Sequence, residues 1–258
     1  MAFKSKYGPW AFVAGASEGL GAAFAEALAI RGLNLILVAR RKDKLESLAQ
    51  KISEKYAVKV QTESLDLSQY ESVLTFINSL DQEVGLLVYN AAYAPIGYFS
   101  EMDSEHLLKV VDVNVKAPLL LAKLFSKGML HRKKGGIVLM SSLSGTQGSP
   151  KIAAYAASKA FNTILAEGLW NELKKSGVDV IASNAGAIRT PGYQQAQDKE
   201  APGTLDAAKV AEETLSALGK DPGVTPGFTN KIARFLMGRL LPRKMAVSIM
   251  EKNTKKLS

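Results

Sequence analysis

A glycine-rich turn between an apolar strand and an alanine-rich helix restricts the fold of this chain more than any other feature. The segment 10–14 is apolar, and a helical pattern follows over 22–31. Between them lie Gly15, Gly19 and Gly21. Glycines permit a tight turn and close approach of a ligand, and the first helical turn offers free N–H groups to a pyrophosphate. A plain strand–helix turn needs one glycine, so three predict a dinucleotide-binding unit instead.

The strand–helix alternation continues to about residue 218. Strands are predicted at 34–39, 58–63, 86–89, 136–140 and 179–182, and helices at 42–55, 70–80, 104–127, 152–175 and 205–218. This pattern predicts an α/β fold: a single doubly wound, Rossmann-type parallel sheet with helices on both faces. We expect residues 1–224 to form this domain and residues 225–258 to form a basic, helical extension packed on it.

Composition excludes several classes of protein. The 258-residue chain is 47% apolar and 22% charged, which is ordinary for a globular domain. It has no cysteine, so disulfides and cysteine–metal sites are excluded. Its two histidines, His106 and His131, are isolated, so we expect both at the surface and no metal site. With no apolar signal region and no apolar run near the ~20 residues of a membrane span, a cytoplasmic location is expected.

The end of the second predicted strand indicates which dinucleotide binds. An acid there would bind the adenosine ribose hydroxyls, whereas arginine suits a 2′-phosphate. The chain has Arg40 and Arg41 and no acid at this point. This favours NADP(H) over NAD(H). The alternative is that 40–44 is only the solvated start of the next helix.

A tyrosine and a lysine form the candidate acid–base pair. Tyr155 and Lys159 stand four residues apart in a run of helix formers. That spacing places both on one helix face, about 5–6 Å apart at Cβ. Free tyrosine titrates near pH 10, and a neighbouring ammonium favours the phenolate, which moves the pKa toward neutrality. Alternatively, Tyr155 packs in the core and Lys159 is solvated.

Two loops invite a functional interpretation. The loop after the fourth strand contains Tyr93, Ile96, Tyr98 and Phe99, which are either ordinary packing or the wall of an apolar substrate site. The segment 183–202 has little periodicity. Irregular segments of this length in compact domains are usually functional and often form lids.

Together these motifs resemble the short-chain dehydrogenase/reductase family, in its form of about 250 residues, over residues 8–215. The matching residues, in order and at the family's spacings, are Gly15, Gly19, Gly21, Asp66, Leu67, Asn90, Ala91, Asn114, Ser142, Tyr155 and Lys159. The segment 7–10, with Arg40, Lys44 and Leu45, is similar to a hydroxysteroid and long-chain 3-ketoacyl reductase branch. The chain departs from the family at Ala14, Ala92 and Ala185, where Thr, Gly and Pro are usual.

The resemblance implies roles for the matching residues. Tyr155 would give a proton to the substrate carbonyl oxygen, and Lys159 would lower the pKa of the phenol and hold the nicotinamide ribose. Ser142 would polarise the carbonyl, and Asn114 would keep a water in the proton relay. The cofactor-binding residues implied are Gly15, Ser17, Gly19, Leu20, Gly21, Arg40, Arg41, Asp66, Leu67, Asn90, Ala91, Tyr155, Lys159, Gly186, Ile188 and Thr190.

The C-terminal stretch carries most of the excess positive charge of +9. From residue 228 onward, one acid, Glu251, stands among eight basic residues: Lys231, Arg234, Arg239, Arg243, Lys244, Lys252, Lys255 and Lys256. The stretch 231–241 has helical potential. It could pack over the active-site mouth or a neighbouring subunit, contact a membrane surface, or remain a mobile solvated tail. Nucleic acid is not expected, because no recognised binding motif accompanies the charge.

The expected function is therefore an NADP(H)-dependent oxidoreductase that interconverts a ketone and a secondary alcohol on an apolar acyl-, lipid- or steroid-like substrate. One alternative is a non-catalytic dinucleotide-binding protein that senses NADPH, and another is a lipid reductase attached to a membrane. The family resemblance implies a homodimer or tetramer formed through the helices that contain Asn114 and Tyr155.

Overall fold

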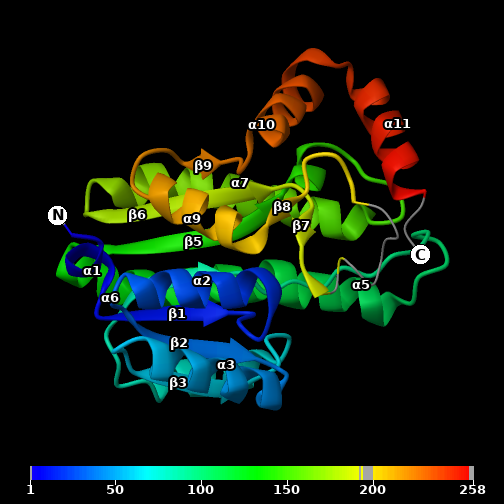
Figure 1. Cartoon of the computed structure of the whole chain (residues 1–258). Coiled ribbons are helices and arrows are strands. Elements are labelled where there is room, and N and C mark those ends of the chain that lie inside the picture. Colours follow the sequence, from blue (N-terminus) through cyan, green and yellow to red (C-terminus); the bar gives the residue numbers. More distant parts are fainter. Residues whose placement is uncertain (1, 192, 194–199, 256–258) are drawn as a thin grey trace.

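The computed structural model describes residues 2–191, 193 and 200–255. Its centre is a parallel sheet of seven strands in the order β3-β2-β1-β4-β5-β6-β9, covered by helices on both faces (Figure 1). The strands are β1 (Trp10–Ala14), β2 (Asn34–Ala39), β3 (Val60–Ser64), β4 (Val84–Tyr89), β5 (Gly135–Ser142), β6 (Val178–Ala185) and β9 (Gly223–Val224). The predicted fold, a single doubly wound α/β sheet, is confirmed.

The helices connect and cover these strands. They are α1 (Phe3–Tyr7), α2 (Gly19–Ile30), α3 (Lys42–Lys55), α4 (Tyr70–Asn78), α5 (Ser104–Val111), α6 (Ala117–Arg132), α7 (Ala153–Lys174), α9 (Ala207–Ala217), α10 (Phe228–Phe235) and α11 (Arg243–Thr254). No helix in the described part of the chain is both long enough and apolar enough to cross a bilayer.

The continuous apolar runs of the strands exist because both faces of the sheet are buried. Along β2, Leu35 and Leu37 pack in one core with α2, α3 and α9, whereas Ile36 and Val38 pack in a second core with α4, α6 and α7. Neighbouring strands alternate in the same way. The two cores fix the height and orientation of each strand end, and these ends carry the site.

The strand order changes direction next to β1. β2 and β3 follow one another on one side of β1, and β4, β5 and β6 follow one another on the other side. β1 lies between β2 and β4, so the loops that follow β1 and β4 meet at the carboxyl edge of the sheet. Asn90 joins them: its Nδ2 donates to the carbonyl oxygen of Gly15, and its backbone N–H donates to that of Ala14, both at 3.0 Å. These bonds tie the two loops together where the family's usual threonine hydroxyl is replaced by Ala14. Ligands of open parallel sheets bind at such points.

Several elements differ from the sequence-based expectation. The predicted helix 104–127 is interrupted by a π-helical turn over Asp112–Lys116 and continues to Arg132. Two short parallel strands, β7 (Ile188–Arg189) and β8 (Leu205–Asp206), pair with each other, and β9 extends the main sheet. Two-residue strands leave no periodic pattern, which is why these were not predicted.

The C-terminal residues form two helices where one was expected. α10 and α11 make an arm that rises from the end of β9 and returns toward the body (Figure 1), and a π-helical turn over Leu236–Leu240 ends the first helix. Asn230 anchors α10 by donating to the carbonyl oxygens of Gly203 and Pro226 at 3.0 Å. Arg243 anchors α11 by donating to that of Thr146 at 2.6 Å. The second helix therefore contacts the loop that precedes α7.

Candidate active site

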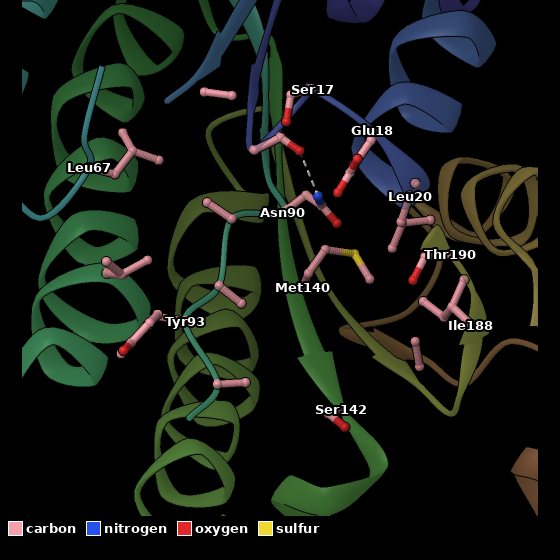
Figure 2. Close-up of a pocket in the computed structure, with 18 of the residues that line it drawn as sticks. Ser17, Glu18, Leu20, Leu67, Asn90, Tyr93, Met140, Ser142, Ile188 and Thr190 are labelled. Carbon is pink, nitrogen blue, oxygen red and sulfur yellow. Dashed lines mark hydrogen bonds between the residues drawn. The ribbon is translucent and has the colours of Figure 1, made fainter. Parts of the chain in front are cut away.

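A cleft of about 590 Å³ opens at the carboxyl ends of the strands. Its walls contain every residue that we predicted to bind the cofactor or act in catalysis except Gly21 and Asn114. Figure 2 shows the glycine turn with Ser17 and Leu20 at one end of this cleft, Asn90 and Met140 in the middle, and Ser142 at the other end. The sequence motifs thus converge in one place.

The glycine turn has the geometry that its sequence predicted. Gly15 adopts a left-handed φ of 78°, which a residue with a side chain would adopt only under strain. A Cβ on Gly21 would lie 1.9 Å from the carbonyl oxygen of Gly15, so α2 begins directly against the turn. Gly21 therefore packs against the turn without lining the cleft. Gly19 and Leu20, in the first turn of α2, do line the cleft.

Ser142 and Tyr155 meet although thirteen residues separate them. Ser142 ends β5, Tyr155 lies in the first turn of α7, and both side chains line the cleft. Lys159, one turn further along α7, is only 2% exposed. Its Nζ lies 5.5 Å from the centroid of the Tyr155 ring and donates to the carbonyl oxygen of Met140 at 2.9 Å. The three side chains form one cluster at the floor of the cleft.

The electrostatics of this cluster correct one expectation. Burial raises the pKa of Tyr155 above its ordinary value, and the hydrogen bond with Ser142 opposes that rise. The amine of Lys159 is directed to the carbonyl oxygen of Met140. Burial lowers the pKa of Lys159 to about 8, which brings this group, and not the phenol, near neutrality.

Asn114 lies behind the cleft, in the π-helical turn, and is fully buried. Its Nδ2 donates to the carbonyl oxygen of Tyr93 at 2.8 Å and to Oγ of Ser158 at 3.0 Å, and its Oδ1 accepts the backbone N–H of Tyr93 at 2.8 Å. Asn114 therefore joins the loop after β4 to α7. Single π-helical turns are frequent at functional sites.

The two arginines after β2 lie at the other end of the cleft, exposed at its wall. Arg41 is already engaged: its Nη2 lies 3.0 Å from Oγ of Ser17 and 2.6 Å from Oε1 of Glu18. Lys44 contacts Oε2 of the same carboxylate at 2.5 Å. Glu18 was not predicted as a site residue, although an acid inside the glycine turn was a visible signal.

A second, smaller pocket of about 220 Å³ shares Tyr155 with the cleft. It is mostly apolar, and its lining residues are Pro95, Gly97, Tyr98, Phe99, Met102, Leu107, Pro150, Lys151, Ile152, Ala153, Ala154 and Tyr155. Two of the four large side chains noted in the loop after β4, Tyr98 and Phe99, thus form the wall of a pocket beside the candidate acid. Tyr93 lines the cleft itself.

The irregular segment 183–202 is only partly described. Its first residues, to Ala185, extend β6, and Gly186, Ile188 and Thr190 line the cleft as predicted. Arg189 forms ion pairs with Glu200 at 2.5 Å and with Asp206. Residues 192 and 194–199, on which the expectation of a lid partly depends, lie outside the described residues.

Several known proteins are similar to this chain in sequence. The chain is 32% identical to the very-long-chain 3-oxoacyl-CoA reductase of Phaeosphaeria nodorum, over 95% of this chain and 76% of that protein. It is 33% identical to the 7beta-hydroxysteroid dehydrogenase of Clostridium sardiniense, over 83% of this chain and 82% of that one. It is 37% identical to the inactive hydroxysteroid dehydrogenase-like protein 1 of Homo sapiens, over 68% of this chain and 54% of that protein.

Solved structures match the fold as well. A 7beta-hydroxysteroid dehydrogenase superposes with a TM-score of 0.89 at 28% identity, over 97% of this chain and 99% of the other. A short-chain dehydrogenase from Sphingobium yanoikuyae in complex with NADPH gives a TM-score of 0.77 at 29% identity, over 84% and 87% of the two chains. The family model for short chain dehydrogenase matches residues 9–201. The chain belongs to the short-chain dehydrogenase family of oxidoreductases, which bind nicotinamide dinucleotides.

Proposed function

We propose that this protein is an NADP(H)-dependent oxidoreductase that interconverts a ketone and a secondary alcohol on an apolar substrate. The observation that carries the proposal is the convergence of Ser142, Tyr155 and Lys159 between the large cleft and the apolar pocket. A carbonyl placed there would meet a hydrogen-bond donor and a proton donor together, as reduction of a ketone requires.

The residues of the cleft fit a dinucleotide phosphorylated on its adenosine ribose. The close contact of Gly21 with the turn at Gly15 leaves the first turn of α2 open for a pyrophosphate. Arg40 and Arg41 offer cations where β2 ends, and no acid stands among the first three residues after that strand. The NADPH bound by the protein from Sphingobium yanoikuyae supports the same choice here. NADPH, when bound, supplies the hydride.

The chain's own residues would handle the proton. The phenol of Tyr155 donates its proton to the substrate oxygen as negative charge develops there, and the hydroxyl of Ser142 donates a hydrogen bond to the same oxygen. Lys159 then restores the proton of the phenol through a water that Asn114 would hold, because a group with a pKa of about 8 exchanges protons readily near neutral pH. Alcohol oxidation uses the same steps in reverse.

The apolar pocket supports an apolar substrate. Tyr98, Phe99 and Met102 line it beside Tyr155, so an acyl chain or a ring system could extend from the reacting carbonyl into it. The names of two relatives, a very-long-chain 3-oxoacyl-CoA reductase and a 7beta-hydroxysteroid dehydrogenase, include both kinds of substrate.

The rival proposal is a non-catalytic sensor of NADPH, and the inactive human relative gives it weight. The intact cluster of Ser142, Tyr155 and Lys159 favours an enzyme, because a sensor needs no proton donor. A panel of ketones of graded chain length, assayed with NADPH and with NADH, separates the two. Oxidation of NADPH with an apolar ketone supports the enzyme, and no turnover with any ketone supports the sensor.

We further propose that residues 1–224 form the NADP-binding domain and that the extension 225–258 docks on a surface of anionic lipid. Phe228 and Phe235 are 78% and 54% exposed on the side of α10 opposite the anchor Asn230. Cations of the same arm, including Lys231 and Arg239, suit anionic headgroups. A second copy fits this face less well, because a symmetric contact would place like charges together.

The expected homo-oligomer would use a different surface. Ile164 on α7 is 67% exposed and Leu119 on α6 is 46% exposed, although both are large and apolar. Such side chains on neighbouring helices suit a symmetric contact with a second copy. We therefore propose that α6 and α7, the helix that carries Tyr155, form the subunit interface.

A further inference from the structure

An acid stands where the additional phosphate of NADPH would bind. Glu18 lies inside the glycine turn and lines the cleft between Ser17 and Leu20 (Figure 2). Its two carboxylate oxygens contact different cations, Arg41 at 2.6 Å and Lys44 at 2.5 Å. The carboxyl side chain is 28% exposed, and the two basic side chains are about half exposed.

This carboxylate is ionised at neutral pH. Hydrogen bonds from Arg41 and then from Lys44 hold the pKa of Glu18 below its usual value. Arg41 bridges Glu18 and Ser17, so its guanidinium lies against the glycine turn. One negative charge therefore already uses two of the cations that follow β2.

A 2′-phosphate needs those same cations. A phosphate monoester carries a charge of about −1.5 to −2 at pH 7 and binds best to arginine through two parallel hydrogen bonds. On Arg41 it would share the guanidinium with the carboxylate of Glu18, which already holds Nη2, and it would remain close to that like charge. A nucleotide without the 2′-phosphate neither needs Arg41 nor places a negative charge beside Glu18. The glycine turn and the end of β2 thus influence cofactor choice in opposite directions.

We propose that Glu18 sets the ratio of NADPH to NADH affinity by competing with the 2′-phosphate for Arg41 and Lys44. The inference rests on the proposed function, namely that this cleft binds a nicotinamide dinucleotide. Glu18 weakens a preference that Arg40, Arg41 and Lys44 create. The enzyme would therefore favour NADPH less strongly than its basic residues alone indicate, and the carboxylate is the group that moderates this preference.

The test is direct binding of both nucleotides to wild-type protein and to Glu18→Gln, measured as dissociation constants by titration calorimetry without substrate. The substitution keeps the shape of the side chain and removes its charge. We expect the NADPH dissociation constant to fall about tenfold, the effect of about 1.4 kcal/mol, and the NADH value to change less than about twofold. A Glu18→Ala variant should shift the ratio in the same direction.

The matched control is Glu46→Gln. Glu46 is an acid of α3 that pairs with Lys42 at 3.8 Å and does not line the cleft, so neither dissociation constant should change. If the ratio of NADPH affinity to NADH affinity stays constant or falls in Glu18→Gln, the inference is overturned and the proposed function remains intact. A wild-type protein that binds neither nucleotide overturns the proposed function, and the inference with it.

Discussion

The amine of Lys159 donates a hydrogen bond to the carbonyl oxygen of Met140, at 2.9 Å. This bond ties α7 to the end of β5, the strand that supplies Ser142. Ser142 and Tyr155 are thus positioned by a buried lysine whose amine bonds to the strand. Lys159 therefore has a structural contribution as well as a chemical one.

The buried amine of Lys159 predicts a specific dependence of stability on pH. Burial lowers its pKa from 10.5 to about 8, so between these values the unfolded chain binds a proton that the folded chain has released. Stability then rises with pH through this window and is lowest, for this group, below pH 8. Relative to Lys159→Met, the wild type should gain on the order of 2 kcal/mol between about pH 8 and pH 10.

Urea unfolding of both proteins at several pH values measures this gain. A Lys127→Met variant, with its change in the helix α6, is the control and should track the wild type at every pH. A difference between wild type and Lys159→Met that stays constant with pH would show that the amine titrates normally.

Loss of the Ser142 hydroxyl should affect both rate and pH profile. Ser142→Ala removes the hydrogen bond that lowers the pKa of Tyr155, and it removes a donor to the developing oxyanion. We expect turnover to fall by about 100-fold, as for loss of one oxyanion donor. In alcohol oxidation, which needs the phenolate, the acid limb of the pH–rate profile should move to higher pH. An unchanged limb would separate Ser142 from the titration of the phenol.

Replacement of Asn114 should lower the free energy of unfolding. Asn114→Ala leaves the backbone N–H of Tyr93 without its acceptor and the carbonyl oxygen of Tyr93 without its donor. Each buried group left unpaired costs about 1–3 kcal/mol, so we expect a loss of about 2–4 kcal/mol in the free energy of unfolding. Asn78→Ala, at the exposed end of α4, is the control and should cost less than about 0.5 kcal/mol. Denaturant unfolding measures both, and equal effects would contradict the bridging role.

The exposed face of α10 predicts lipid binding that depends on charge. Intact protein should sediment with vesicles that contain phosphatidylserine and much less with vesicles of phosphatidylcholine alone. Changing Phe228 and Phe235 together to Ser should reduce sedimentation about tenfold, because the apolar surface that enters the lipid is lost. Ile30→Ser, at an exposed apolar position on α2, is the control. Equal sedimentation of all three proteins would contradict docking on lipid through this face of α10.

The sequence predicted those parts of the fold that local pattern determines. Strands such as β2 are buried on both faces, so each appears as an unbroken apolar run, and the glycine turn marks the first crossover. The order of the motifs then sufficed to place Ser142 and Tyr155 at one edge of the sheet. Bounds differed by a few residues where strands continue into the site, as β5 does to Ser142.

What the sequence did not predict depends on tertiary contacts. The π-helical turn at Asn114 has no local signature, since it is stabilised by the bonds of Asn114 to Tyr93 and Ser158. The pKa of Tyr155 depends on burial by distant segments, so a rule based on spacing from Lys159 gave the wrong direction. Glu18 was visible in the sequence, but its contacts with Arg41 and Lys44 follow only from the fold.

The most direct test of the central claim is single-turnover hydride transfer in Tyr155→Phe. Tyr155 lines both the cleft and the apolar pocket, so we propose its phenol as the group that gives the substrate its proton. With an apolar ketone that the wild type reduces, we predict a rate at least about 100-fold lower in the variant, with an NADPH dissociation constant within about threefold of the wild type. Retention of the wild-type rate, with NADPH bound normally, would contradict the assignment of Tyr155 as the proton donor.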